Sequence, residues 1–197
     1  MRTRTFAVLS ALSLFALALP ALAAPLSYRL EDARGQVHTE AELKQQKLTV
    51  FVFMAPECPL SNRAVPELNR LAKEYGEKGV AFYGVSADPA YSAEVVRKHD
   101  EEFGLVFPTL LDHGLVLVHH AGARVTPEVA VIAPDGAVLY VGRIDDRAVE
   151  FGKVRAQPKR QDLRAALDEA LSGKPVSQPV LRSIGCAIPG ANKSAQR

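Results

Sequence analysis

The chain has 197 residues, of which 48% are hydrophobic and 23% charged, which is enough for one domain with a proper hydrophobic core. Its 24 basic and 22 acidic side chains give a formal net charge of +2, so the sequence lacks the electrostatic footprint of a nucleic-acid-binding protein. It also contains no internal repeat and no low-complexity tract.

Residues 1–23 have the pattern of a secretory signal peptide. Arg2 and Arg4 precede an apolar segment over residues 6–19, and a Pro-Ala-Leu-Ala sequence ending at Ala23 supplies a small-residue cleavage site. The apolar segment is shorter than the roughly 20 residues that a membrane-spanning helix needs, which favours cleavage over an uncleaved anchor. Removing 23 residues, with two of the 24 basic side chains, leaves 174 residues without formal net charge. We expect a periplasmic or secreted protein with no membrane insertion after cleavage.

A small hairpin is predicted at the start of the mature chain. Residues 27–30 and 36–39 flank the turn-forming sequence Asp32-Ala-Arg-Gly35, and residues 40–45 follow as a short helix. We interpret this hairpin as an N-terminal addition to the core of the domain.

A buried strand, a cysteine and an amphipathic helix come next. Residues 50–53 are β-branched and aromatic, which is typical of a short buried strand. After Cys58, apolar side chains recur at three- and four-residue spacing, as on one side of a helix: Val65, Leu68, Leu71, Ala72 and Tyr75. The first turn of a helix presents unpaired N–H groups and the positive end of the helix dipole, so Cys58 should have a lowered pKa and act as a nucleophile. The alternative is a small buried hydrophobic side chain.

This arrangement resembles the active-site turn of the thioredoxin superfamily. In that family an aromatic-rich strand leads to Cys-x-x-Cys at a helix start, and a helix proline lies eight positions after the first cysteine. Cys58 and Pro66 match this spacing, and the resemblance implies that Pro59 contacts the substrate. Ser61 stands where the second cysteine would be, so the motif reads Cys-Pro-Leu-Ser. Any intramolecular disulfide chemistry must then use a thiol from elsewhere.

The remaining pattern alternates between strands and helices. In chain order we predict a strand at 80–85, helices around 95–103 and at 115–121, strands at 129–132 and 138–141, and a helix at 162–171. Asp112 should cap the second of these helices, and the helix around 95–103 should place Val95, Val96, His99 and Phe103 on one side. This order predicts an α/β protein with a mixed central sheet and helices on both faces, as in the thioredoxin-like fold.

Thr126-Pro127 directly precedes the predicted strand at 129–132. In the thioredoxin superfamily the residue pair at this position contains a cis-proline that faces the cysteine and offers backbone groups to an extended peptide. The resemblance therefore implies a cis bond before Pro127 and substrate contacts from both residues. An ordinary trans proline at a strand start is the alternative.

The last part of the chain resembles a group of exported bacterial redoxin-domain proteins, on the redoxin and alkyl hydroperoxide reductase branch of the superfamily. The shared motifs are Gly142-Arg-Ile-Asp-Asp-Arg147 and a terminal Gly-Cys that ends at Cys186. We expect a redoxin domain over residues 24–175 and a tail over 176–197. Arg143, Asp145, Asp146 and Arg147 either orient the tail or a substrate, or form a solvated turn whose salt bridges contribute about 0 to 1 kcal/mol each.

Cys186 is the candidate resolving thiol. We expect it on a mobile segment that docks through the apolar side chains Val180, Leu181, Ile184 and Ile188. The alternatives are a permanent structural bridge to Cys58 and an unrelated free thiol.

Three functions compete for Cys58. As a thiol-disulfide oxidoreductase, the protein would attack a protein or small-molecule disulfide with the Cys58 thiolate and would be reduced by a thiol electron donor. As a peroxidase, it would form a sulfenic acid at Cys58. However, the peroxiredoxin motif Pro-x-x-x-Thr/Ser-x-x-Cys has Phe51 and Ala55 at its proline and hydroxyl positions here, which disfavours fast peroxide reduction.

The third function is a non-enzymatic copper-binding or partner-binding module. A copper site would need both cysteines and one histidine to converge. Adjacent residues on a helix point about 100° apart, so His119 and His120 should not bind one metal ion together. We therefore expect no metal site and no cofactor, and we favour the oxidoreductase.

Overall fold

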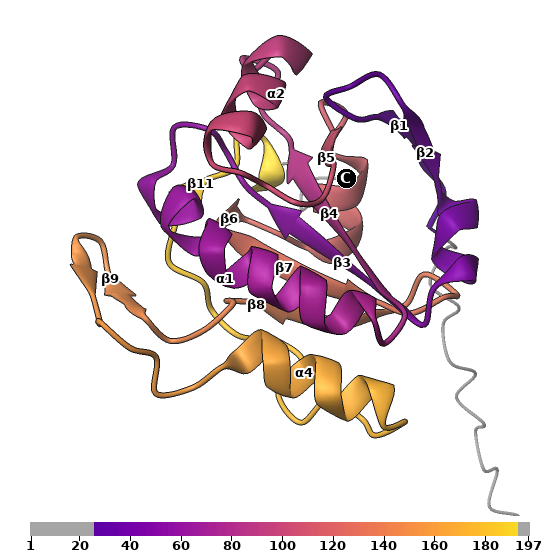
Figure 1. Cartoon of the computed structure of the whole chain (residues 1–197), viewed down its shortest axis with the longest axis vertical. Helices are drawn as coiled ribbons and strands as arrows, with labels where there is room; N and C mark the ends of the chain where they lie inside the picture. The colour runs from indigo at the N-terminus through magenta and orange to yellow at the C-terminus, as the bar shows by residue number, and fades with distance from the viewer. Residues whose placement is uncertain (1–25, 193–197) are drawn as a thin grey trace, which may run out of the picture.

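The computed structural model describes residues 26–192, and the predicted signal peptide lies outside them. A five-stranded sheet forms the centre, in the order β5-β4-β3-β7-β8 (Figure 1). These strands are β5 (Thr109–Leu111), β4 (Val80–Ser86), β3 (Leu48–Phe53), β7 (Glu128–Ile132) and β8 (Val138–Gly142). Strands β3, β4 and β5 are parallel, whereas β7 and β8 are antiparallel to their neighbours. The predicted mixed sheet is confirmed.

Helices cover both faces of the sheet: α1 (Pro59–Gly76), α2 (Ala93–Glu102), α3 (Val116–Ala121) and α4 (Asp162–Leu171). Strand β3 is buried on both sides, and its side chains alternate between two hydrophobic clusters. Val50 and Val52 join the cluster that contains α1 and α4, whereas Phe51 and Phe53 join the one that contains α3. No helix within residues 26–192 is long and apolar enough to cross a membrane.

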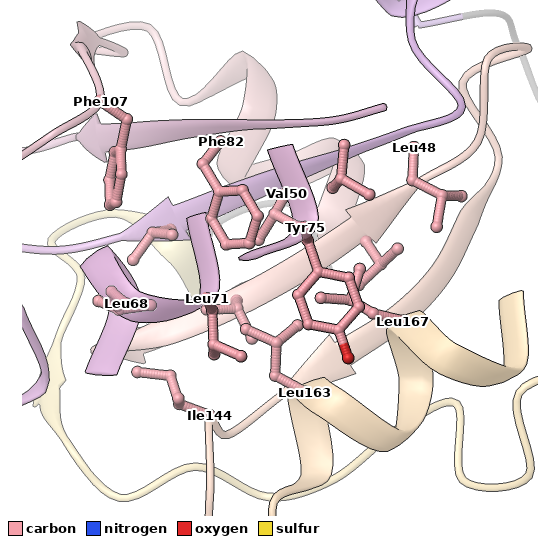
Figure 2. Close-up of a cluster of buried hydrophobic side chains, with 14 of the residues drawn as sticks. Leu48, Val50, Leu68, Leu71, Tyr75, Phe82, Phe107, Ile144, Leu163 and Leu167 are labelled. Carbon is pink, nitrogen blue, oxygen red and sulfur yellow. The ribbon is translucent and has the colours of Figure 1, made fainter. Parts of the chain in front are cut away.

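The interface between α1 and α4 fixes the helix that follows Cys58. Leu163 and Leu167 of α4 pack against Leu71 and Tyr75 of α1 (Figure 2). The Tyr75 hydroxyl donates to the Asp168 carboxylate at 2.6 Å. Burial of each such side chain contributes about 1.5 to 3 kcal/mol, so α4 holds the C-terminal half of α1 in place.

The N-terminal hairpin is also confirmed, with β1 (Arg29–Glu31) antiparallel to β2 (Val37–Thr39). The short helix that follows, η1 (Glu40–Gln45), is a 3-10 helix. Asp112 caps α3 as expected, because its carboxylate accepts from the N–H groups of the first turn at 2.7 to 3.1 Å.

Several elements were not predicted, because they are too short to show a repeating pattern of apolar side chains. They are β5 and four two- or three-residue strands, namely β6 (Val125–Thr126), β9 (Ala148–Glu150), β10 (Lys153–Val154) and β11 (Cys186–Ala187). The predicted apolar side of α2 was partly wrong, since Val95 is 44% and Phe103 38% exposed, and Val96 and His99 are buried. Helix α2 contacts the sheet mainly at the edge strand β5. This strand covers only a narrow side of the helix.

Candidate active site

Cys58 lies at the junction of β3 and α1, as predicted. It is the residue immediately before α1, and Pro59 occupies the first helical position, where the missing N–H of proline costs nothing. The Cys58 residue is only 1% exposed, whereas Pro59 is exposed. The Cys58 sulfur therefore lies at the start of a helix, and other parts of the chain cover it.

The loop before β7 faces this sulfur. The peptide bond between Thr126 and Pro127 is cis, which confirms the prediction. When protonated, the Cys58 thiol donates to the Thr126 carbonyl oxygen, 3.0 Å away.

The tail brings the second cysteine to the same point. Strand β11 pairs antiparallel with β6, so that Cys186 lies opposite Thr126 (Figure 1). Cys186 Sγ is 2.9 Å from Cys58 Sγ, and both thiols are free. Two cysteines that are 128 positions apart in the sequence therefore form one dithiol site.

Backbone contacts on both sides of Cys186 hold the tail in place. Before it, the N–H of Val141 in β8 donates to Pro179 at 2.8 Å, and the N–H of Leu181 donates to Val141 at 3.0 Å. After it, the N–H of Ile188 donates to Arg124 at 2.9 Å, and Ile188 is buried. A Cβ atom at Gly185 would overlap the Thr126 carbonyl, so only glycine permits this close approach.

One expectation for the tail needs correction. Val180 does not dock, because it is 65% exposed, whereas Leu181 packs on the core cluster that contains α1. A parallel bridge between Val141 and Val180 shows why: the backbone at Val180 is held along the edge of β8 while its side chain faces solvent.

The two thiols differ strongly in acidity. Burial of the Cys58 thiol raises its pKa, whereas a hydrogen bond from Cys186 lowers it. The hydroxyls of Thr126 and Ser61 and the Ser61 N–H lower it further, so the pKa of Cys58 falls to about 7. Burial and the neighbouring Cys58 sulfur raise the pKa of Cys186 to about 11. Near neutral pH the site therefore holds a thiolate at Cys58 and a thiol at Cys186.

Ser61 and Thr126 were not recognised from the sequence as partners of the thiolate. Both hydroxyl oxygens are buried and have no hydrogen-bond partner among residues 26–192, so each hydroxyl can turn its proton toward the Cys58 sulfur. In the sequence, Ser61 stood out only because it occupies the position of the second cysteine of the Cys-x-x-Cys motif. Its position three residues after Cys58, one helical turn away, was the signal that could have identified it.

A pocket opens beside the two sulfurs. It has a volume of about 240 Å³, and its lining includes Met54, Glu57, Tyr91 and Pro189 besides both cysteines. Burial and the nearby Glu57 carboxylate raise the pKa of Tyr91. A small molecule could therefore reach Cys58 while the tail stays in place.

A hydrogen-bonded chain from α2 supports the turn before Cys58, and this chain was not predicted from the sequence. The Asn62 amide donates to the Pro56 carbonyl at 3.0 Å, and its oxygen lies 2.8 Å from His99 Nε2. His99 is buried and its ring stacks near Phe103 at 4.7 Å. The turn that precedes Cys58 is thus tied to two helices.

The segment 142–147 is not a solvated turn. Asp146 is 7% exposed and accepts from the N–H groups of Lys159 and Arg160 at 2.7 and 3.0 Å. Arg143 Nε donates to the buried Asp162 carboxylate at 2.6 Å. These contacts join the end of β8 to the start of α4. Arg143 also lines a second, largely apolar pocket together with Pro127, Leu60 and Ile184.

Within residues 26–192, no group of three or more His, Cys, Asp or Glu side chains is arranged to hold a metal ion. Three of the histidines have other partners. His38 contacts Asp32 and Glu42, and His120 lies 2.7 Å from the Gly136 carbonyl. The third, His99, belongs to the chain described above.

Comparison with known proteins agrees with this geometry. The model of the AhpC/TSA family matches residues 19–141. The chain belongs to the AhpC/TSA family. The family match covers the first cysteine, the cis-proline loop and most of the central sheet, but neither α4 nor the tail.

Individual relatives carry related names. The chain is 29% identical to the thiol-disulfide oxidoreductase ResA of Halalkalibacterium halodurans over 127 residues, which are 64% of this chain and 70% of that protein. It is 30% identical to ResA of Bacillus anthracis over 116 residues, which are 55% of this chain and 66% of that protein.

Solved structures confirm the thioredoxin-like fold. A hypothetical protein, SMc02350 from Sinorhizobium meliloti 1021, superposes with a TM-score of 0.72 at 29% identity, covering 82% of this chain and 90% of its own. An uncharacterized conserved protein from Geobacillus kaustophilus gives 0.71 at 29%, covering 87% and 93%. A thiol:disulfide interchange protein of the thioredoxin family from Chlorobium tepidum TLS gives 0.56 at 20%, covering 77% and 99%, and supports the fold alone.

Proposed function

We propose that the protein is a thiol-disulfide oxidoreductase that alternates between the Cys58 and Cys186 dithiol and a disulfide between them. The observation that carries this proposal is the 2.9 Å separation of the two sulfurs. The pKa of about 7 at Cys58 supports it, because a thiolate is the attacking species. The names of the ResA relatives support it as well.

The reaction uses the two cysteines in order. The Cys58 thiolate attacks one sulfur of a substrate disulfide, which forms a mixed disulfide and releases one substrate thiolate. Cys186 then loses its proton and attacks Cys58 Sγ, which releases the second substrate thiolate and leaves the Cys58–Cys186 disulfide. The substrate gains two electrons, and a thiol donor must return them to the protein.

The substrate site of this proposal lies around the cis-proline loop. Pro59 directly follows Cys58, the Thr126 carbonyl accepts from its thiol, and Pro127 and Arg143 line the apolar pocket. We assign these four residues to substrate contacts. Residues 1–23 support action in the periplasm or outside the cell, and the tail from residue 176 supplies the resolving thiol.

Peroxide reduction is the second candidate, because the family match and the pocket at Cys58 favour it. The thiolate would attack one peroxide oxygen, break the O–O bond and become a sulfenic acid, and Cys186 would then displace water to form the same disulfide. Ala55 leaves the usual hydroxyl position empty, so we expect this reaction to be slow.

The test is thiol mapping of the purified protein with glutathione disulfide, for the wild type, Cys58→Ser and Cys186→Ser. We expect the intact mass of the wild type to fall by two hydrogen atoms, and the peptide map to show a disulfide between the two cysteines. Cys186→Ser should retain glutathione on Cys58, and Cys58→Ser should react far more slowly. Two free thiols in the wild type after treatment would contradict the proposal. Hydrogen peroxide consumption by the same three proteins tests the second candidate.

A further inference from the structure

The pocket beside the two sulfurs is small, and its charged side chains are all acidic. Its volume of about 240 Å³ lies below the roughly 300 to 1,000 Å³ of pockets that bind drug-sized ligands, so a ligand that fits inside it is small. Its lining includes the carboxylates of Glu57 and Asp88 and no lysine, arginine or histidine side chain. The pocket that leads to Cys58 therefore carries negative charge.

Basic side chains do not neutralise these two carboxylates. Within residues 26–192, the ion pairs all involve other acidic residues. Asp88 accepts from the N–H of Ala90 at 2.9 Å, a donor without formal charge. Burial and the Glu57 carboxylate raise the pKa of Tyr91, so this tyrosine stays uncharged at neutral pH. Both negative charges are thus available to a cation in the pocket.

The reactive form of the site adds a third negative charge. With a pKa of about 7, Cys58 is mostly a thiolate at pH 8, whereas Cys186, with a pKa of about 11, remains an uncharged thiol. The positive end of the α1 dipole, equivalent to about half a charge, offsets only part of this total. Because opposite charges attract and like charges repel at short range, the pocket favours a cationic ligand over an anionic one.

A buried hydroxyl offers a hydrogen-bond acceptor to such a ligand. Thr126 is 5% exposed and lines the pocket, and its hydroxyl has no hydrogen-bond partner in the part of the chain that the structure describes. When this hydroxyl turns its proton toward the Cys58 sulfur, its lone pairs can accept from an ammonium N–H. Met54 and Ile188, which also line the pocket, offer apolar surface to the methylene groups between nitrogen and sulfur.

Building on the proposed function, we propose that this pocket binds low-molecular-weight disulfides with an ammonium group a few bonds from each sulfur, and that Glu57 and Asp88 select them by charge. The Cys58 thiolate attacks the nearer ligand sulfur, the S–S bond of the ligand breaks, and one aminothiol leaves with the electron pair and takes up a proton. Cys186 then loses its proton and attacks Cys58 Sγ, which expels the second aminothiol. The ligand gains two electrons and two protons, and the protein becomes a disulfide.

Three disulfides of similar size and different charge test this assignment. Cystamine carries two positive charges, bis(2-hydroxyethyl) disulfide carries none, and 3,3′-dithiodipropionate carries two negative charges. Each is mixed with the reduced protein at pH 8, and acid quenching with intact mass spectrometry gives the rate at which the reduced protein is lost. Each rate is divided by the rate of the same disulfide with 2-mercaptoethanol, which removes differences in intrinsic reactivity. We expect the normalised rate of cystamine to exceed that of dithiodipropionate by roughly tenfold or more, with the neutral disulfide between them.

A double variant, Glu57→Gln with Asp88→Asn, tests the role of the two carboxylates. The asparagine keeps an oxygen that can accept from the N–H of Ala90. We expect the ratio of the normalised cystamine and dithiodipropionate rates to fall about fivefold, because two charges near the ligand are lost. Both rates come from one protein, so a change in the reactivity of Cys58 cancels from their ratio. Glu77→Gln is the matched control and should leave the ratio unchanged, since Glu77 lies beyond the far end of α1, about 27 Å along the helix axis.

The outcomes separate charge selection from the function on which it rests. Equal normalised rates for the three disulfides in the wild type, or an unchanged ratio in the double variant, would refute charge selection and leave the oxidoreductase function intact. If none of the three disulfides produces a bond between Cys58 and Cys186, both proposals are refuted.

Discussion

Ser61 shows how a single side chain sets the chemistry of its neighbour. It occupies the position of the second cysteine in a Cys-x-x-Cys motif, yet its hydroxyl and N–H both favour the Cys58 thiolate. The second sulfur comes instead from Cys186. The motif thus keeps an acidic thiol at Cys58 although the second cysteine of the motif is missing. The position of Cys58 at a helix start followed from the residues alone, but the role of Ser61 depends on a hydroxyl orientation that no sequence pattern contains.

Replacing Ser61 with alanine should raise the pKa of Cys58 by about half a unit to one unit, because one hydrogen bond to the thiolate is lost. Thiolate absorbance at 240 nm, followed from pH 5 to 10 in the reduced protein, measures this shift. Ser172→Ala is the matched control, since Ser172 lies at the exposed end of α4, where its hydroxyl donates to the Asp168 carbonyl. If the titration midpoint of Cys58 is unchanged in Ser61→Ala, the other hydrogen bonds are enough to keep the pKa of Cys58 low, and the prediction is wrong.

At the scale of elements, the decisive structure is the pairing of β6 with β11, each only two residues long. Longer elements such as α1 and β3 were predictable, because their apolar side chains repeat over many residues. A two-residue strand has no repeat, and its partner lies 60 positions away. The path of the tail across the cis-proline loop could therefore not be predicted from the sequence, whereas the presence of a second cysteine could be read from it directly.

Replacing Gly185 with alanine should loosen this pairing, because the added Cβ meets the Thr126 backbone. A strain of about 1.4 kcal/mol would raise the population with an undocked tail tenfold, and Cys58 should then react about tenfold faster with a maleimide that carries a polyethylene glycol chain too bulky for the pocket. The rate of Cys58 alkylation, read from peptide masses, measures the effect. Gly114→Ala serves as the control, since a Cβ there meets only Val116, at 3.8 Å. Equal protection in both variants would mean that β11 does not shield Cys58.

At the scale of the whole molecule, the active site joins two parts of the chain. The family match ends at residue 141, and the following residues contribute α4, the braced segment 142–147 and the tail. Helix α4 was predictable from its apolar side, because Leu163 and Leu167 recur at helical spacing. The family domain supplies Cys58, and the extension supplies the second sulfur, Cys186. Stability and redox chemistry should therefore be linked across the molecule.

The stability of the reduced protein should rise with pH through the titration of Cys58. Its pKa is about 7 in the folded protein against an ordinary 9.0, so the unfolded chain binds more protons between these values. The free energy of unfolding should therefore increase by about 2 kcal/mol from pH 7 to 9. Cys186, with a pKa of about 11, acts in the opposite sense from pH 9 to 11.

Urea unfolding in the presence of a phosphine reductant, at pH 7, 8 and 9, checks this dependence. The difference between the wild type and Cys58→Ser removes the contribution of all other titrating groups that the two proteins share. A difference that stays flat over this range would mean that the Cys58 thiolate adds nothing to folding.

The hairpin of β9 and β10 allows the redox state of the two cysteines to be detected by proteolysis. The hairpin extends from the body of the molecule (Figure 1), and Phe151 at its tip is 68% exposed. It also lies between Cys58 and Cys186 in the sequence, inside the loop that their disulfide would close. One protease cut at Phe151 would separate the reduced chain into two polypeptides, whereas the oxidised chain would remain a single covalent molecule with four ends.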